Sequence, residues 1–249
     1  MTTANKPSSK RRIILKLSGE ALREAGSKDN ISPEIVDRMA SEVQAAVATG
    51  QVELGIVCGG GNFWRGASAS ARGMDRATAD YVGMLATVMN ALALQGALED
   101  KGVTTIVQSA IEMQNVAETF IRREASHHLS KGRVVIFAAG TGSPFFSTDT
   151  TAALRASEMG ADCVLKATMV DGVYDSDPKK NPEAKRYERV SFHECISKQL
   201  KVMDSTAFSL CMENEIPIMV FDLEKPGNVT AALLGDGVGT VVDTKGSQE

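Results

Sequence analysis

The sequence has few of the residues that cross-link small proteins or bind structural metals. Its four cysteines lie far apart, without a Cys-x-x-Cys pair, and the chain has only three histidines. Neither a disulfide framework nor a zinc site is therefore favoured. Apolar runs are also short: the longest, such as 134–139, fall well below the roughly 20 residues of a membrane-spanning helix. The run 13–15 is too short for a signal-peptide core, so we expect a cytoplasmic protein with a disordered tail over 1–10.

The chain also lacks an excess of positive charge. It has 27 lysines and arginines against 31 aspartates and glutamates, which gives a formal net charge of -4. This balance provides no general attraction to nucleic acid or anionic membranes, so any bound phosphate must be held by a few placed lysines and arginines. A secondary role in DNA-bound regulation stays open as an alternative, although the acidic charge and the lack of a helix-turn-helix signal argue against it.

What the sequence does contain is a regular alternation of β-rich and helical patterns. The predicted strands are 13–17, 53–57, 103–107, 133–138, 163–166 and 216–221, and the predicted helices are 33–49, 76–100, 117–128, 150–159, 194–200, 205–214 and 227–234. This spacing predicts βαβ crossovers and a mainly parallel sheet. Near-continuous apolar runs such as 134–137 indicate strands covered on both faces, so we predict an α/β fold, a three-layer α/β/α sandwich forming a single domain over 11–249. The charged segment 179–189 predicts a surface loop or hairpin.

Two glycine turns follow the first two predicted strands, where ligands bind in open parallel sheets. In Lys16-Leu17-Ser18-Gly19-Glu20, backbone N–H groups can point at phosphate oxygens while the lysine supplies charge, although an ordinary strand exit gives the same pattern. Gly59-Gly60-Gly61-Asn62 costs backbone entropy unless something approaches the main chain closely. The nearby Arg65 favours phosphate over a purely structural turn. No dinucleotide fingerprint or P-loop motif is present.

A third turn runs from Gly140 to Thr150. Its hydroxyls, its free N–H groups and a helix start capped at Thr148 or Asp149 predict an edge that binds an anion and a ring. Burial in the core is the alternative for its aromatic residues, Phe145 and Phe146.

Three later residues add charge and an aromatic ring. Lys166, at another strand end, would bring a second cation to the same edge, and two lysines can neutralise charge on a transferred γ-phosphoryl group. Tyr174 could stack on a purine or pack a loop. Asp204 opens a helix and could be a cap, or it could hold the two lysines in position.

In this order, the motifs resemble the amino acid kinase fold family, and within it the group of bacterial uridylate kinases. The matching stretches are 16–22, 59–66, 83–90, 140–146, 166–174 and 201–204, in colinear order between about 11 and 242. No single turn is specific, but the ordered set is. Ser143 and Ser147 depart from the asparagine and threonine of other members, which puts fine affinity in doubt.

The resemblance implies transfer of the ATP γ-phosphoryl group to UMP, giving UDP and ADP in pyrimidine nucleotide biosynthesis, with Mg²⁺ carried on the nucleotide and no metal held by the protein. An acceptor-binding part would cover about 11–160 and an ATP-binding part about 161–245. By resemblance, the catalytic residues are Lys16, Lys166 and Asp204, with Asp204 orienting the lysines. The ATP-binding residues are Lys16, Leu17, Ser18, Gly19, Gly61, Arg65, Thr168, Tyr174 and Asp177. The UMP-binding residues are Gly60, Asp80, Thr141, Gly142, Ser143, Pro144, Phe145, Phe146, Ser147 and Thr148.

The resemblance also implies a homohexamer activated by GTP and inhibited by UTP. The predicted helix 76–100, rich in small residues and methionine, suits a dimer interface, and a buried core helix explains it equally well. Two other functions remain open: a related kinase that phosphorylates a carboxylate or carbamate acceptor such as acetylglutamate or glutamate, and a protein that senses nucleotides without turnover. The possible nucleobase edge favours UMP over the former, and the two lysines with Asp204 favour catalysis over the latter.

Overall fold

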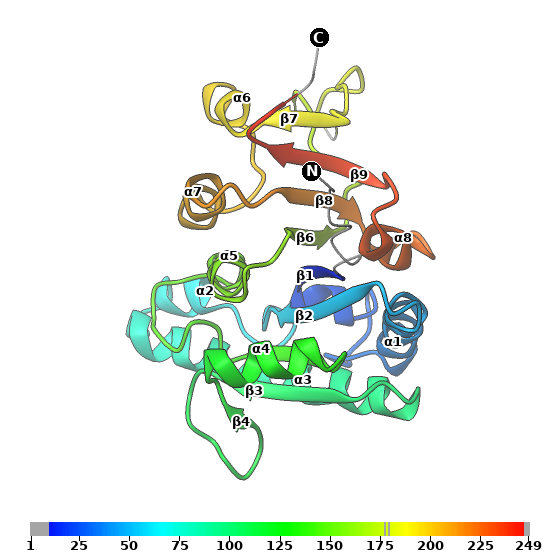
Figure 1. The fold of residues 1–249 in the computed structure, drawn as a ribbon. Coiled ribbons are helices and arrows are strands. Elements are labelled where there is room, and N and C mark those ends of the chain that lie inside the picture. The colour runs from blue at the N-terminus through cyan, green and yellow to red at the C-terminus, as the bar shows by residue number, and fades with distance from the viewer. Residues whose placement is uncertain (1–9, 177, 179, 247–249) are drawn as a thin grey trace, which may run out of the picture.

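The computed structural model describes residues 10–176, 178 and 180–246. Residues 1–9 of the expected tail, and Asp177 of the expected ATP site, lie outside the described residues. Within them, the strands form one nine-stranded sheet in the order β4-β3-β5-β2-β1-β6-β8-β9-β7 (Figure 1). The strands are β1 (Arg11–Leu17), β2 (Val52–Cys58), β3 (Thr105–Ser109), β4 (Glu118–Thr119), β5 (Val134–Ala138), β6 (Cys163–Thr168), β7 (Arg189–Ser191), β8 (Ile218–Asp222) and β9 (Gly239–Asp243).

Helices cover both faces of this sheet. They are α1 (Pro33–Val47), α2 (Gly66–Ser70), α3 (Arg76–Asp100), α4 (Arg122–Ser130), α5 (Thr148–Met159), α6 (Phe192–Ser197), α7 (Ser205–Glu213) and α8 (Asn228–Leu234), with a 3₁₀ turn, η1, at Gly19–Leu22. Figure 1 shows α5 and α7 on one face of the sheet and α1 and α8 on the other, and α3 shares the core of the second group. Every neighbouring strand pair in the described residues is parallel except β8–β9. The predicted three-layer sandwich with a mainly parallel sheet is confirmed.

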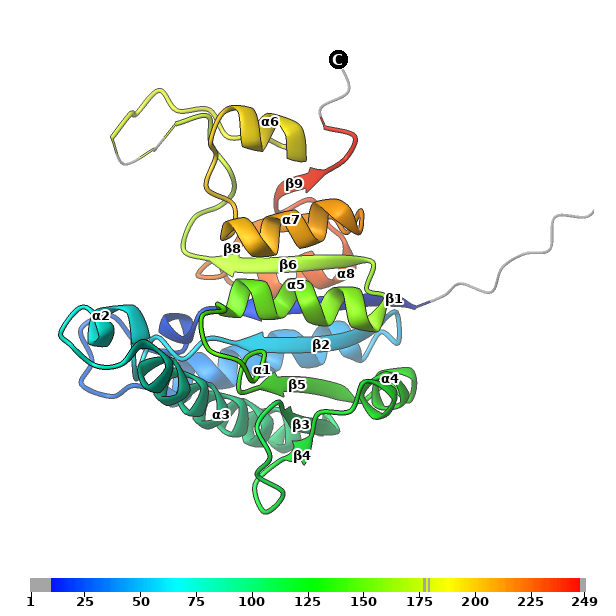
Figure 2. The same cartoon turned by 90° about the vertical axis from the view of Figure 1, so that its left-hand side faces the viewer.

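Strand β1 lies at the centre of the sheet, between β2 and β6, and Figure 2 shows these strands running between the two helical layers. Because side chains alternate along a strand, Ile13, Leu15 and Leu17 enter the core beneath α1 and α3, whereas Ile14 enters the core beneath α5. All four side chains are fully buried. A strand covered on both faces needs apolar residues on both, which explains the uninterrupted run 13–15 in the sequence.

The sequence misplaced or missed several short elements. The predicted helix 117–128 begins later, at Arg122, because Glu118–Thr119 forms β4 beside β3 and Ile121 has an extended backbone. Strands β7 and β9 were not predicted, and β9 enters the sheet antiparallel to β8. In the segment expected to be a loop or hairpin, Arg186 forms an antiparallel bridge with Tyr174, as in a hairpin.

Among the described residues, α3 is the one helix long and apolar enough to cross a membrane, by length and composition only. The expectation that apolar stretches fall short of that length is therefore wrong for this helix. Core helices of soluble proteins pass the same test, and α3 buries Leu94, Leu98 and other residues in the core beside α1. Hydrophobic residues on several sides of a helix are expected when it packs into a large core.

Candidate active site

Two lysines face each other at the carboxyl end of the sheet. Lys16 of β1 and Lys166 of β6 are in register on adjacent parallel strands, so their side chains point to the same face. The carboxylate of Asp149, in the first turn of α5, lies between them. Its Oδ1 is 2.8 Å from the Lys16 Nζ, and its Oδ2 is 2.7 Å from the Lys166 Nζ. The Lys166 Nζ also donates to the Val202 carbonyl at 2.7 Å, so both ammonium groups are fixed in place.

The electrostatics of this cluster favour an anionic ligand. Burial raises the pKa of Asp149, but the charges of Lys16 and Lys166 outweigh burial and hold that pKa below its ordinary value. Asp149 is therefore ionised at neutral pH. Two ammonium groups and one carboxylate give this cluster of three side chains one net positive charge. Such a fixed cation can stabilise negative charge on a phosphoryl group.

Asp204, expected to orient the two lysines, lies elsewhere. It is the N-cap of α7, where its Oδ1 accepts from the Ala207 N–H at 2.9 Å. The same carboxylate accepts from the hydroxyls of Thr150 and Ser147. The expectation that Asp204 holds the lysines is wrong, because Asp149 occupies that position while Asp204 ties the start of α7 to the start of α5. The predicted cap of α5 is also corrected, since Ser147 accepts from the Thr150 N–H at 3.1 Å.

The first two glycine turns lie against each other. A Cβ on Gly19 would stand 2.6 Å from the Gly59 carbonyl oxygen and 2.7 Å from the Gly61 nitrogen, so a larger residue would push the turns apart. Arg65 extends from the second turn and forms an ion pair with Glu20 of the first. The structure thus brings together the predicted phosphate-binding residues of these turns: Lys16, Leu17, Ser18, Gly19, Gly61 and Arg65. The partner Glu20 was not predicted, although it stands in the same short motif.

A cavity of about 140 Å³ opens between α3 and the start of α5, the helix that carries Asp149. Its lining residues are Gly60, Trp64, Gly66, Asp80, Gly83, Met84, Thr87, Gly140, Phe146, Ser147 and Thr148. Five of them were predicted to bind the acceptor: Gly60, Asp80, Phe146, Ser147 and Thr148. Trp64, Met84 and Thr87 were missed, even though each lies within or beside a motif, because a sequence does not show which helix face meets a turn.

Asp80 connects α3 to the third glycine turn. Both of its carboxylate oxygens accept from the Arg76 Nε at 2.9 Å, and one accepts from the Phe145 N–H at 2.8 Å. Phe145 is 67% exposed and Phe146 is 51% exposed, so burial of these rings in the core, the alternative to ring binding, is wrong. Phe145 also has a positive φ of 72°, unusual for a bulky residue. The loop holds both rings outward, and Phe146 lies at the edge of the cavity.

The first part of the third turn lies away from this cavity. Thr141, Gly142, Ser143 and Pro144 are absent from its lining. A Cβ on Gly142 would stand 2.9 Å from the Ala110 carbonyl oxygen, so the turn packs on the segment after β3. The Thr141 hydroxyl accepts from the Ser143 N–H at 3.2 Å, which closes the turn on itself.

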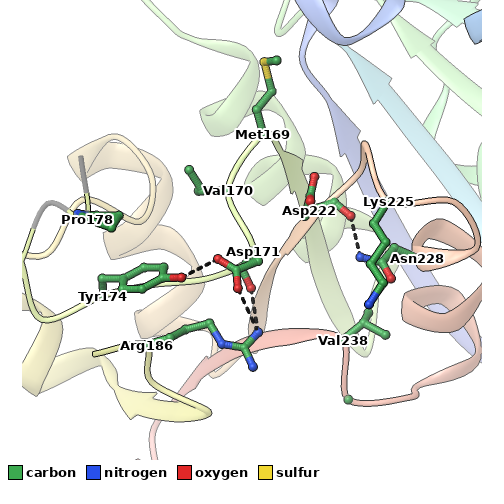
Figure 3. Close-up of a pocket in the computed structure, with 11 residues that line it drawn as sticks. Met169, Val170, Asp171, Tyr174, Pro178, Arg186, Asp222, Lys225, Asn228 and Val238 are labelled. Atoms are coloured by element: carbon green, nitrogen blue, oxygen red, sulfur yellow. Dashed lines mark hydrogen bonds and ion pairs between the residues drawn. The ribbon is translucent and has the colours of Figure 1, made fainter. Parts of the chain in front are cut away.

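Two larger hollows flank the loop that follows β6. One, of about 640 Å³, includes Tyr174, Asp222, Lys225 and Asn228 in its lining (Figure 3). The other, of about 440 Å³, includes Val173, Tyr174, Leu200 and Lys201. Tyr174 borders both.

In Figure 3 the Tyr174 hydroxyl points at Asp171, to which it donates at 2.7 Å, and this hydrogen bond raises the pKa of the tyrosine. Arg186 holds the other side of Asp171, with its Nη1 at 3.7 Å from the carboxylate. Thr168, at the end of β6, lines neither hollow, and its hydroxyl accepts from the Val170 N–H. Asp177 lies outside the described residues. The described part of the chain gathers no group of three or more metal-ligating side chains.

Comparison with known proteins identifies the family to which this chain belongs. Residues 11–222 match the model of the Amino acid kinase family. The chain belongs to the amino acid kinase family. The resemblance inferred from the ordered motifs is thereby confirmed.

Solved structures of other amino acid kinases are similar over nearly the whole chain. A UMP kinase from Ureaplasma parvum is 40% identical with a TM-score of 0.90, and the match covers 94% of this chain and 99% of that one. A UMP kinase from Bacillus anthracis is 38% identical with a TM-score of 0.90, covering 95% and 97%. A uridylate kinase from Archaeoglobus fulgidus is 30% identical with a TM-score of 0.70, covering 92% and 99%. This amino acid kinase is therefore a phosphotransferase whose similar solved structures include UMP kinases.

Proposed function

We propose that this amino acid kinase transfers the γ-phosphoryl group of ATP to UMP, giving UDP and ADP in pyrimidine nucleotide biosynthesis. The observation that carries the proposal is the pair of in-register lysines bridged by Asp149, which stands in the same first turn of α5 that lines the cavity beside α3. The similarity of the fold to three structures described as UMP or uridylate kinases supports the choice of acceptor.

In this proposal, catalysis comes from position and charge. Lys16 and Lys166 neutralise charge that develops on the transferred group and on the bridging oxygen of the leaving ADP. Asp149 holds their ammonium groups close together and in place. The acceptor is a phosphate monoester, already anionic at neutral pH, so no side chain has to remove a proton before attack. Correct alignment of the two nucleotides then accounts for much of the rate.

The donor would lie along the first two glycine turns. Ser18, Gly19 and Gly61 offer backbone N–H groups to the phosphates, buried Leu17 contributes through its backbone, and Arg65 adds charge after leaving Glu20. Tyr174 and Thr168, with Asp177, would bind the adenine and ribose. We further propose that Mg²⁺ enters bound to the ATP phosphates, where it would offset part of their negative charge.

The acceptor would occupy the cavity beside α3. Gly60 allows UMP to approach the backbone, and Asp80 would accept hydrogen bonds from the ribose hydroxyls. The segment from Thr141 to Thr148 would close over the uracil, with Thr141, Gly142, Ser143 and Pro144 moving toward the base. The exposed rings of Phe145 and Phe146 then gain apolar contacts that they lack in this structure.

We also propose a cytoplasmic homohexamer, activated by GTP and inhibited by UTP. The exposed Tyr81, Leu85 and Met89 lie at intervals of four residues on α3 and form one apolar stripe, which supports association through this helix. Light scattering coupled to size exclusion, on wild type and on Leu85→Glu, tests the assembly. A monomeric wild type would contradict it. Initial rates with added GTP or UTP test the two effectors.

The decisive experiment is a coupled ADP-release assay with ATP, Mg²⁺ and a series of acceptors: UMP, CMP, dUMP, AMP, acetylglutamate and glutamate. We expect the highest kcat/KM with UMP, and loss of turnover without Mg²⁺. Turnover of acetylglutamate without turnover of UMP would identify the related carboxylate kinase instead. Tight ATP binding without turnover of any acceptor would identify a nucleotide sensor. Repeating the series with GTP guards against missing an enzyme that is inactive without its activator.

A further inference from the structure

A reciprocal amide pair lies buried beneath the second glycine turn. The Asn62 Nδ2 donates to the Asn90 Oδ1 at 2.9 Å, and the Asn90 Nδ2 donates back to the Asn62 Oδ1 at 2.8 Å. The remaining N–H groups donate to backbone: Asn90 to the Gly59 carbonyl at 2.7 Å and Asn62 to the Asn30 carbonyl at 2.8 Å. Asn90 is fully buried, and Asn62 nearly so. Every amide hydrogen of the pair is therefore used, which makes this a complete polar network inside the core.

The same face of α3 reaches the third glycine turn. One helical turn before Asn90, the Thr87 hydroxyl accepts from the Ala139 N–H at 2.8 Å and donates to the Met84 carbonyl at 2.7 Å. Ala139 has a positive φ of 60°, a conformation that non-glycine residues seldom adopt without being held there. The hydroxyl of Thr87 thus fixes the point at which β5 leaves the sheet and the acceptor turn begins.

The helix also meets the second turn directly. A Cβ on Gly60 would stand 2.6 Å from the Gly83 carbonyl oxygen and 2.8 Å from the Ala86 Cβ, so the turn packs on the backbone of α3. Thr87 and Asn90 are three residues apart, or about 4.5 Å along a helix axis. One rigid helix face therefore holds both turns: Asn90 and Gly83 hold the second glycine turn, and Thr87 holds the start of the third.

We propose that Asn90, Asn62 and Thr87 are positioning residues, which fix the spacing between the donor turn and the acceptor turn. The buried amide pair does not line the acceptor cavity, and Thr87, which does, acts through the hydrogen bond that it accepts from the Ala139 N–H. The inference rests on the proposed function, because the two turns must hold two phosphates in line for transfer. Phosphoryl transfer needs the reacting atoms about 3–3.5 Å apart, and an error of about 1 Å can lower the rate about 100-fold. The hydrogen bond from Asn90 fixes the orientation of the Gly59 carbonyl. Two apolar side chains in place of the amide pair would fill the same space but would leave this carbonyl free to rotate.

The first test separates positioning from folding. In Asn90→Leu, the Asn62 amide loses its partner, so we expect a clear fall in melting temperature. In the double variant Asn62→Leu/Asn90→Leu both amides are gone, and part of the melting temperature should return, because two apolar groups replace two matched polar ones. The Gly59 carbonyl stays without its donor in both variants. We therefore expect kcat to fall about 10- to 100-fold in both, with KM for ATP and for UMP within about threefold of wild type.

The matched control lies on the same helix. The Gln95 Nε2 donates to the Thr105 carbonyl at 3.1 Å, at the opposite end of β3 from the glycine turns. Gln95→Leu should lower stability with kcat unchanged. Calorimetric titration of ATP and of UMP, each alone, should give wild-type affinities for the double variant.

The acceptor side has its own pair of variants. Thr87→Val keeps the shape but removes the acceptor for the Ala139 N–H, and Thr87→Ser restores a hydroxyl. We expect kcat to fall in Thr87→Val and to recover in Thr87→Ser. Wild-type kcat in both the double variant and Thr87→Val, measured on folded protein, would overturn the proposal and leave the network a stability feature. Failure of wild type to phosphorylate UMP would instead overturn the proposed function.

Discussion

Replacement of Asp149 by asparagine tests the centre of the site. In wild type one carboxylate lies 2.8 and 2.7 Å from two ammonium groups, and all three side chains are largely buried. The Asp149→Asn variant would keep the shape but lose the charge, leaving two cations in register on adjacent strands with no anion between them. Removing one partner of a buried ion pair costs about 3–5 kcal/mol. Because both lysine side chains retain some water contact, we expect a value near 3 kcal/mol, or about 6–12 °C in melting temperature for a chain of this length.

The stability that Asp149 contributes should depend on pH in a defined direction. Since the lysines lower the folded-state pKa of Asp149, its contribution to stability is complete above the unfolded pKa and disappears as pH falls through the folded pKa. With an unfolded value of about 3.9, the difference in free energy of unfolding between wild type and Asp149→Asn should be full at neutral pH and shrink below about pH 4. Urea unfolding across this range measures it.

Kinetics complete the test. We expect kcat of Asp149→Asn to fall about 100-fold, because the two ammonium groups move apart and no longer converge on the transferred group. Asp204→Asn is the comparison, since asparagine can still cap α7 and the variant loses mainly the charge that accepts from the Ser147 and Thr150 hydroxyls. Wild-type kcat in Asp149→Asn, or a larger loss of kcat in Asp204→Asn, would refute the assignment of the lysine bridge to Asp149.

Three other predictions follow from the same geometry. Lys166→Ala should lower kcat about 100-fold while changing the Kd for ATP little, as measured by single-turnover kinetics and titration, and undiminished turnover would remove Lys166 from the mechanism. Gly19→Ala should raise KM for ATP and cost about 1–3 kcal/mol in urea unfolding, because its Cβ would meet the Gly59 carbonyl; wild-type values would mean that the turns do not touch. All four thiols are buried, and burial raises the pKa of Cys58 to about 12, so iodoacetamide at pH 8 should label no cysteine in the folded protein and all four in urea, as counted by mass spectrometry.

The strands and the glycine turns could be predicted because each is a local pattern. An apolar run such as 13–15 reports burial on both faces, and a turn rich in glycine marks the end of a strand. The two lysines were found for the same reason, since each ends a predicted strand. Their shared partner was not, because Asp149 meets them only after α5 packs across β1 and β6. Asp204 and Asp149 both open helices, and no local signal distinguishes the one that caps from the one that bridges.

The outward orientation of the two phenylalanines in the third glycine turn could not be predicted from local sequence either. Phenylalanine usually lies in the core, and nothing near Phe145 indicates that a positive φ turns its ring outward. Strands β7 and β9, at the end of the sheet, were missed because neither exceeds five residues and the sheet changes direction between β8 and β9. Thr87 and Asn90 stood inside a recognised motif, but their role depends on which face of α3 meets two distant turns.

The central position of β1 has a consequence for how the chain is made. Of the nine described strands, β1 is synthesised first, yet its partner β6 begins at Cys163, more than a hundred residues later. Until then, one side of β1 has its N–H and C=O groups unpaired between two apolar faces, which is the kind of edge that promotes aggregation. A fragment ending at residue 160 would keep that edge permanently open. The two parts of the chain meet at the β1–β6 pair, so either part expressed alone would expose the edge of one of these strands, and pairing across so long a separation makes folding slow.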